Sequence, residues 1–115
     1  MAPNKDFLLI LKSHMLGEGE PDLGEKLIKS FLEQLNESGN LPARIICVNS
    51  GIFLSTEGSA VIDILRKFET DGSEVISCGT CLDYYKRRDK LIIGQPTNMK
   101  VMVGSMLSYK KILAP

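Results

Sequence analysis

Two cysteines separated by two residues, Cys78-Gly79-Thr80-Cys81, bring reactive sulfur together in this sequence. They lie between an apolar segment typical of a strand, 74–77, and the start of a helical segment, 82–85. At a helix N-terminus, the free backbone N–H groups and the macrodipole favour negative charge. We therefore expect a thiol here to ionise more readily than its ordinary pKa of about 8.5 allows.

Other roles for the cysteine pair give different expectations. Both thiols could be small buried apolar groups, because free cysteine is often buried. A zinc site needs further ligands, and the remaining candidates are Cys47, inside a predicted strand, and the lone His14, so we expect no metal. A thioredoxin-like role requires the pair after an early strand and a later cis-proline loop, for which Pro96 is a weak candidate.

The composition restricts the class of protein. The 115 residues are long enough to bury a core, and we expect a single domain over 1–115. Fourteen Lys and Arg balance fourteen Asp and Glu, which argues against a nucleic-acid or membrane partner. The odd cysteine count and the short apolar run 7–11 predict a cytoplasmic protein with free thiols and no membrane segment.

Strand and helix patterns alternate along the chain. The apolar runs 7–11, 43–48 and 74–77 predict strands, and 111–113 predicts a short last one. Apolar periodicity predicts a helix ending at Gly39, a second from Ser55 or Thr56 to Gly72, and a third to about Arg88. We expect a final helix that Thr97 or Asn98 can cap, with a buried stripe of Met99, Met102, Val103, Met106 and Leu107. This order predicts a three-layer α/β/α sandwich around a mostly parallel sheet of four or five strands.

Three loops follow the carboxyl ends of the first three predicted strands: 13–17, 49–56 and 78–81. Ligands of open α/β sheets bind at this edge, so we expect the loops to share one site. The turn Asn49-Ser50-Gly51 is suited to hold a small anion. We expect His14 to be an ordinary loop residue, Cys47 to lie in the core, and the basic run 86–88 to be a solvated helix face.

The cysteine block resembles a known family. The quoted residues are Ser77-Cys78-Gly79-Thr80-Cys81-Leu82-Asp83-Tyr84-Tyr85, with Asn49-Ser50-Gly51, Thr56-Glu57-Gly58-Ser59 and Thr97-Asn98-Met99. Together they resemble the DsrE/DsrF-like family, most of all the C-terminal domain of YedF-type selenium-metabolism, sulfurtransferase-like proteins. The similarity runs from the first strand to the last helix.

The resemblance implies a sulfur-relay role, a DsrE-like α/β sandwich and assembly into homo- or hetero-oligomers. It places the persulfide carrier at Cys81, which opens the helix after the third strand. Cys78 matches only relatives with two cysteines and is the expected resolving partner. YedF-type proteins usually carry an N-terminal TusA-like domain that this chain lacks, so a TusA-like partner would be a separate chain.

The leading hypothesis is a carrier of sulfur, or of selenium, that loads Cys81 and is resolved by Cys78. The residues expected to shape its pocket are Asn49, Ser50, Gly51, Gly79 and Thr80. We expect this sulfur carrier to need no cofactor. The alternatives are a non-catalytic oligomeric module that binds a small ligand or senses redox state, and a reductase that cycles a Cys78–Cys81 disulfide.

Overall fold

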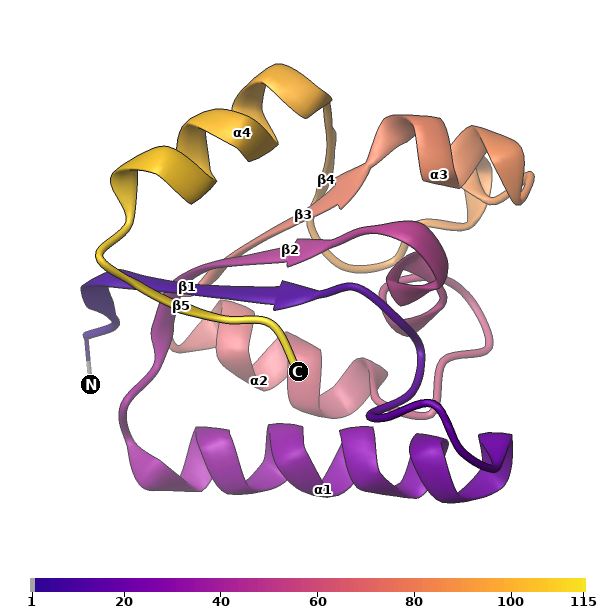
Figure 1. Cartoon of the computed structure of the whole chain (residues 1–115), viewed down its shortest axis with the longest axis horizontal. Coiled ribbons are helices and arrows are strands. Elements are labelled where there is room, and N and C mark those ends of the chain that lie inside the picture. Colours follow the sequence, from indigo (N-terminus) through magenta and orange to yellow (C-terminus); the bar gives the residue numbers. More distant parts are fainter. Residues whose placement is uncertain (1) are drawn as a thin grey trace.

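A computed structural model describes residues 2–115, and its strands form one sheet of five parallel strands (Figure 1). Their spatial order is β4-β3-β2-β1-β5, and each neighbouring pair is parallel. The strands are β1 (Asn4–Leu11), β2 (Pro42–Cys47), β3 (Glu74–Cys78), β4 (Gln95–Thr97) and β5 (Lys111–Leu113). The predicted α/β sandwich is therefore confirmed, with a sheet that is parallel throughout.

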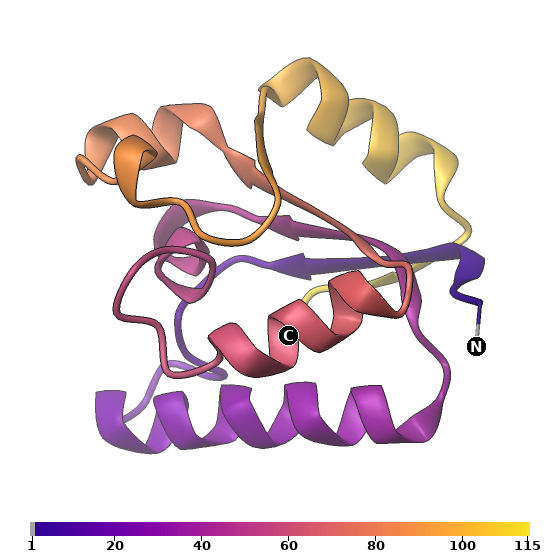
Figure 2. The ribbon, with the colours of Figure 1, turned by 180° about the vertical axis from the view of Figure 1, so that it is seen from behind.

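Helices cover both faces of this sheet. Two lie on one face, α1 (Pro21–Ser38) and α2 (Ile62–Thr70), and two on the other, α3 (Gly79–Tyr84) and α4 (Met99–Ser108), as the opposite views in Figures 1 and 2 show. Short 3₁₀ helices, η1 (Asn49–Leu54) and η2 (Arg88–Lys90), lie near the carboxyl ends of the strands. Within residues 2–115, no helix has both the length and the apolar character needed to cross a lipid bilayer.

The central strand β1 is buried on both faces, as its unbroken apolar sequence predicts. Leu9 and Leu11 join the cluster that packs against α1 and α2. Leu8 and Ile10 point the other way and join the cluster that contains Cys78 and Met102. Alternation along one strand thus divides the core into two layers, and the smaller layer includes Cys78 and packs against Cys81.

The predicted start of the second helix at Ser55 or Thr56 is wrong. Residues 49–54 instead form η1, which buries Ile52 and Leu54, and α2 begins only at Ile62. Both Ser55 and Thr56 are fully buried, and the Ser55 hydroxyl lies 2.7 Å from that of Ser77 in β3. The apolar packing of η1 buries both hydroxyl side chains, and neither of them caps α2.

The third helix ends at Tyr84 and does not reach Arg88 as predicted. Lys86 takes a left-handed backbone conformation, with φ of 57°. The backbone N–H of Arg87 then donates to the carbonyl of Leu82, and that of Lys86 to Asp83. This is the Schellman arrangement that closes many helices, here with lysine in the position usually taken by glycine.

Two predictions for the C-terminal part need correction. The segment Gln95–Thr97 is a strand, β4, which its proline and its shortness concealed. The predicted stripe of α4 is mostly exposed, because only Met102 is buried, whereas Met99 is 60 % and Leu107 82 % exposed.

The cap at Asn98 is confirmed, since its side chain accepts the backbone N–H of Val101. The final strand at 111–113 is also confirmed.

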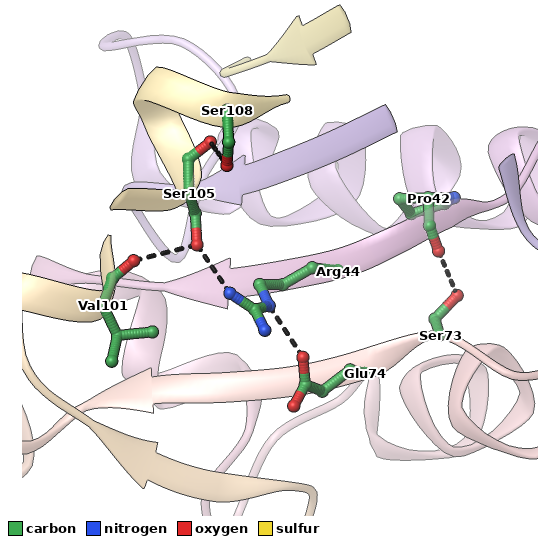
Figure 3. Close-up of polar contacts among 7 residues, drawn as sticks. All are labelled: Pro42, Arg44, Ser73, Glu74, Val101, Ser105 and Ser108. Atoms are coloured by element: carbon green, nitrogen blue, oxygen red, sulfur yellow. Dashed lines mark hydrogen bonds and ion pairs between the residues drawn. The ribbon is translucent and has the colours of Figure 1, made fainter. Parts of the chain in front are cut away.

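A polar network fixes α4 to the sheet (Figure 3). The Arg44 guanidinium of β2 donates to a carboxylate oxygen of Glu74 at 2.7 Å and to the hydroxyl of Ser105 at 2.7 Å. The Ser105 hydroxyl donates in turn to the carbonyl of Val101. The helix is thus held by directional bonds at the amino ends of the strands, which compensates for its sparse apolar packing.

We expect Gly94→Ala to lower the free energy of unfolding by about 3 kcal/mol. Gly94 precedes β4 with φ of 77°, and a Cβ there would collide with the carbonyl of Val75. The matched control is Gly104→Ala in α4, where a Cβ meets nothing within 4 Å and helix propensity should add about 0.5–1 kcal/mol. Urea denaturation measures both variants, and equal stabilities would contradict the assigned backbone.

Candidate functional site

The loops after β1, β2 and β3 meet at the carboxyl edge of the sheet, as the sequence predicted. The backbone N–H of His14, after β1, donates to the hydroxyl of Ser50, after β2, over 3.3 Å. Asn49, the residue before Ser50, donates its backbone N–H to the sulfur of Cys81, after β3, over 3.1 Å. A continuous set of hydrogen bonds therefore joins all three loops.

The turn 49–51 is set tightly against the end of β1. The carbonyl of Leu11 accepts the backbone N–H of Val48, and a Cβ on Gly51 would collide with that same carbonyl. Asn49 adopts φ of 54°, a left-handed conformation that asparagine tolerates better than most residues. Asparagine and glycine at these two places thus allow the turn to approach both β1 and Cys81.

The two cysteines differ in exposure. Cys81 is partly exposed, whereas Cys78 is only 3 % exposed and packs in the smaller core layer. Burial and a hydrogen bond with the Cys78 thiol raise the pKa of Cys81, and the N–H of Asn49 acts in the opposite direction. The expectation of an unusually acidic thiol is therefore corrected: α3 is short, and burial outweighs the single N–H donor.

Cys47 lies in the core, as predicted. It is fully buried below the site, and burial raises its pKa to about 12 despite hydrogen bonds from Ser77 and Ser55. Its thiol therefore stays protonated at neutral pH. The Ser55 and Ser77 hydroxyls lie 2.7 Å apart, so a small polar cluster ties the end of η1 to β3 beneath the exposed thiol.

Aromatic rings surround this edge, and sequence reasoning did not assign them a place. Phe53 packs between His14 and Tyr85, with ring centres 6.2 and 4.7 Å away. The Tyr85 hydroxyl donates to the side-chain oxygen of Asn49 over 3.4 Å. Tyr85 follows Cys81 by four residues, and this helical spacing could have placed the ring beside the sulfur. Nothing in the sequence pattern identified Phe53.

The basic run after α3 is held by other contacts. Arg88 makes a two-point ion pair with Asp83, at 2.6 and 3.0 Å. Arg87 donates to the carbonyl of Glu57 and lies 4.8 Å from the centre of the Phe53 ring. The expectation of a solvated helix face is therefore corrected: the run 86–88 follows the end of α3, and both of its arginines are engaged by contacts within the chain.

The remaining predicted pocket residues, Gly79 and Thr80, are placed differently from each other. Gly79 is buried where a Cβ would crowd the Arg88 side chain and the carbonyl of Thr97, so it permits β4 to approach α3. Thr80 is exposed on α3. Geometry alone gives neither residue a ligand contact, and their role in binding stays a prediction.

Two hollows flank the turn 49–51. A small pocket of about 170 Å³ lies on the α1 side, between His14, Glu25, Phe53 and Val61. A wider one of about 690 Å³ lies beside Asn49 and includes Lys12 and Ser13. Cys81 lines neither of these two hollows. Among residues 2–115, no three His, Cys, Asp or Glu side chains cluster as metal ligands would.

Comparison with solved structures places the fold. The chain resembles the ychN protein of E. coli, with 18 % identity, a TM-score of 0.65, and coverage of 97 % of this chain and all of that one. It also resembles MTH1491 of Methanobacterium thermoautotrophicum, described as a protein of unknown function, at 12 % identity and TM-score 0.69, with the same coverage. These likenesses support the DsrE-like resemblance at the level of the fold. No family model and no curated protein matches the sequence.

At such low identities the DsrE-like fold transfers no activity to this chain. The likeness to the C-terminal domain of YedF-type proteins stays a prediction, as does the homo-oligomer. What the comparison adds is that the arrangement of strands and helices around the cysteine pair recurs over the whole length of two other chains. The chemistry must be argued from the site itself.

We expect the three thiols to react with iodoacetamide in the order Cys81, then Cys78, then Cys47. Only Cys81 is partly exposed, and the pKa of buried Cys47 is about 12. Because the pKa of Cys81 is raised, its thiolate fraction is low at pH 7, and its alkylation should still accelerate above pH 9. Peptide mass mapping after timed alkylation measures each site. An alkylation rate of Cys81 that stopped rising below pH 8 would contradict the raised pKa of this thiol.

Proposed function

We propose that the protein carries sulfur as a persulfide on Cys81. The observation that carries the proposal is that the Cys81 sulfur is partly exposed, accepts the backbone N–H of Asn49, and contacts the thiol of Cys78. An N–H donor aimed at sulfur stabilises a thiolate or persulfide anion more than a neutral thiol. A second thiol within reach supplies a route for release.

Loading is a thiol-exchange step. The Cys81 thiolate attacks the terminal sulfur of a donor persulfide, R–S–SH, so that a new sulfur–sulfur bond forms on Cys81 as the donor's bond breaks. The donor leaves as the thiolate RS⁻. Burial of the Cys81 thiol keeps much of it protonated at neutral pH, so loading requires a proton to leave first.

Release has two routes that use the same geometry. The thiolate of an acceptor can attack the terminal sulfur, which transfers that sulfur and regenerates the Cys81 thiolate. Alternatively, the Cys78 thiolate attacks the inner sulfur of the Cys81 persulfide, which forms a Cys78–Cys81 disulfide and expels HS⁻. The burial of Cys78 protects it from outside reagents and leaves Cys81 as its neighbour for this reaction.

The proposed donor or acceptor is a separate protein, with a TusA-like chain as the candidate that the family resemblance implies. Such a partner would have to present its sulfur to the carboxyl edge of the sheet, where Cys81 accepts the N–H of Asn49. Tyr84, near the end of the same helix α3, is 80 % exposed and packs against Tyr85, which leaves an aromatic surface for contact with a partner.

A second candidate function is a non-catalytic module that binds a small ligand or senses redox state. The observation that favours it is the raised pKa of Cys81, which makes this thiol a slower nucleophile at neutral pH. The wide hollow beside Asn49 supplies a place for a ligand. In this case a Cys78–Cys81 disulfide would form and break without any carried sulfur.

Persulfide loading distinguishes the two functions. We expect wild-type protein incubated with a cysteine desulfurase and cysteine to gain one reducible sulfur atom by intact-mass analysis. Cys81→Ser should abolish the gain, because it removes the carrier. Cys78→Ser should keep the gain and hold it longer, since the internal release step is lost.

Cys47→Ala is the matched control, because it removes a buried thiol outside the site and should load like wild type. Thermal melting checks that each variant is folded. Loading that survives in Cys81→Ser would refute Cys81 as the carrier. The absence of any gain in all four proteins would favour the ligand-binding or redox-sensing module.

A further inference from the structure

A side-chain clamp holds the turn that donates to Cys81. The hydroxyl of Ser50 accepts the backbone N–H of His14 over 3.3 Å and lies 3.1 Å from Nδ1 of the same residue. The two residues are 36 positions apart in the sequence and belong to different loops. The Ser50 hydroxyl can accept two hydrogen bonds and donate one, so it satisfies both contacts in either neutral tautomer of the imidazole. Nε2 of His14 lies 3.9 Å from Oε1 of Glu25.

We propose that His14 is a positioning residue for Cys81: by holding Ser50, it fixes the turn 49–51 and keeps the backbone N–H of Asn49 aimed at the sulfur. The donor N–H lies in the peptide plane that joins Val48 and Asn49, and only the two backbone rotations of Asn49 separate this plane from the Ser50 peptide. A shift of Ser50 therefore changes the backbone angles of Asn49, whose φ is 54°, and with them the position of Asn49 relative to Cys81.

The clamp adds to the backbone hydrogen bonds of the turn, in which the N–H of Val48 donates to the carbonyl of Leu11 and the N–H of Gly51 donates to the carbonyl of Val48. Asn49 is exposed and has a left-handed backbone, which most residues disfavour, and its side chain has only a long 3.4 Å contact with Tyr85. Gly51 holds the other end of the turn by close approach to Leu11, but that contact does not set the direction of the Asn49 N–H. The two contacts of Ser50 with His14 add a side-chain restraint next to Asn49.

The inference rests on the proposed role of Cys81, yet it can be tested on thiol reactivity alone. The rate of alkylation follows the fraction of Cys81 present as thiolate, and the Asn49 donor favours the thiolate. If the donor is misdirected, the whole pH–rate curve of Cys81 moves to higher pH. The titratable and charged groups around this set of contacts are His14, Glu25, Cys78, Tyr85 and Arg87, with Lys12 and Glu18 lining the hollow beside Asn49.

The experiment compares pH–rate curves for iodoacetamide at Cys81, read by peptide mass mapping. We expect Ser50→Ala and His14→Ala to slow alkylation at pH 7.5 by about three- to tenfold, the range for a lost hydrogen bond to a charged group that is partly replaced by water. Ser50→Thr, which keeps the hydroxyl, and His14→Asn, which places an amide oxygen near the Nδ1 position, should stay near wild type. The double variant should be no slower than either alanine variant.

Ser59→Ala is the matched control. It removes a hydroxyl that accepts the backbone N–H of Val61 over 3.1 Å, a bond of the same kind within a neighbouring loop that lines the same pocket as His14. Its Cys81 curve should equal that of wild type. Amide hydrogen exchange at Asn49 gives a second measurement on folded protein, and it should be faster in Ser50→Ala than in Ser59→Ala.

Unchanged curves and unchanged Asn49 exchange in both alanine variants would overturn the positioning role. An equal shift in Ser59→Ala would also overturn it, because the effect would then be general loosening. Loading with inorganic polysulfide separates this result from the proposed function. If the clamp variants shift the curve but wild type gains no sulfur, the carrier function fails and the positioning of the thiol stands.

Discussion

The close approach of Gly51 to the carbonyl of Leu11 is the constraint on which the site depends. That carbonyl accepts the backbone N–H of Val48. No space remains between the same carbonyl and Gly51 for a side chain. The rest of the edge follows from this contact. With the turn against β1, Ser50 reaches His14 and Asn49 reaches Cys81. A displacement of the turn by the width of a methyl group would separate both pairs.

The electrostatics of the site are those of a shielded sulfur and not of a strongly activated one. Two effects, burial and the neighbouring thiol, oppose ionisation of Cys81, and one backbone donor favours it. The Cys81 thiolate is therefore stabilised by the directed hydrogen bond from Asn49 more than by a positive charge. Of the two arginines that follow α3, Arg88 pairs with Asp83 and Arg87 lies over the Phe53 ring. Such a thiol exchanges more slowly than a highly acidic one, but a thiolate of higher pKa is intrinsically the better nucleophile.

Much of the architecture could be predicted from the sequence, because its strongest patterns are long. The apolar run of β1 and the periodicity of α1 each repeat one signal over many residues, so local exceptions do not obscure them. The edge strand β4 has three residues and a proline, and no such signal. The segment from Ser55 to Ala60 misled prediction because its hydroxyls resemble helix caps, whereas Ser55 is buried by the packing of η1.

For the site, sequence order predicted which loops meet but not how their side chains contact one another. Parallel strands bring their carboxyl ends together whatever the side chains are, so the neighbourhood of Asn49 and Cys81 followed from topology. The His14–Ser50 pair spans 36 positions and has no periodicity to reveal it. The acidity of Cys81 was misjudged for a similar reason: a sequence shows that a helix begins nearby, but the depth of a sulfur depends on packing from α4 and η1.

The order of strands has a consequence for how the chain reaches this structure. The outer neighbour of β1 is β5, so the first strand pairs with the last on one side and with β2 on the other. During synthesis, one edge of the most apolar strand therefore stays unpaired until residues 111–113 emerge. Loop closure over such a separation is slow, and an open apolar edge attracts other chains. The nascent chain is thus most prone to aggregation in the interval before β5 arrives.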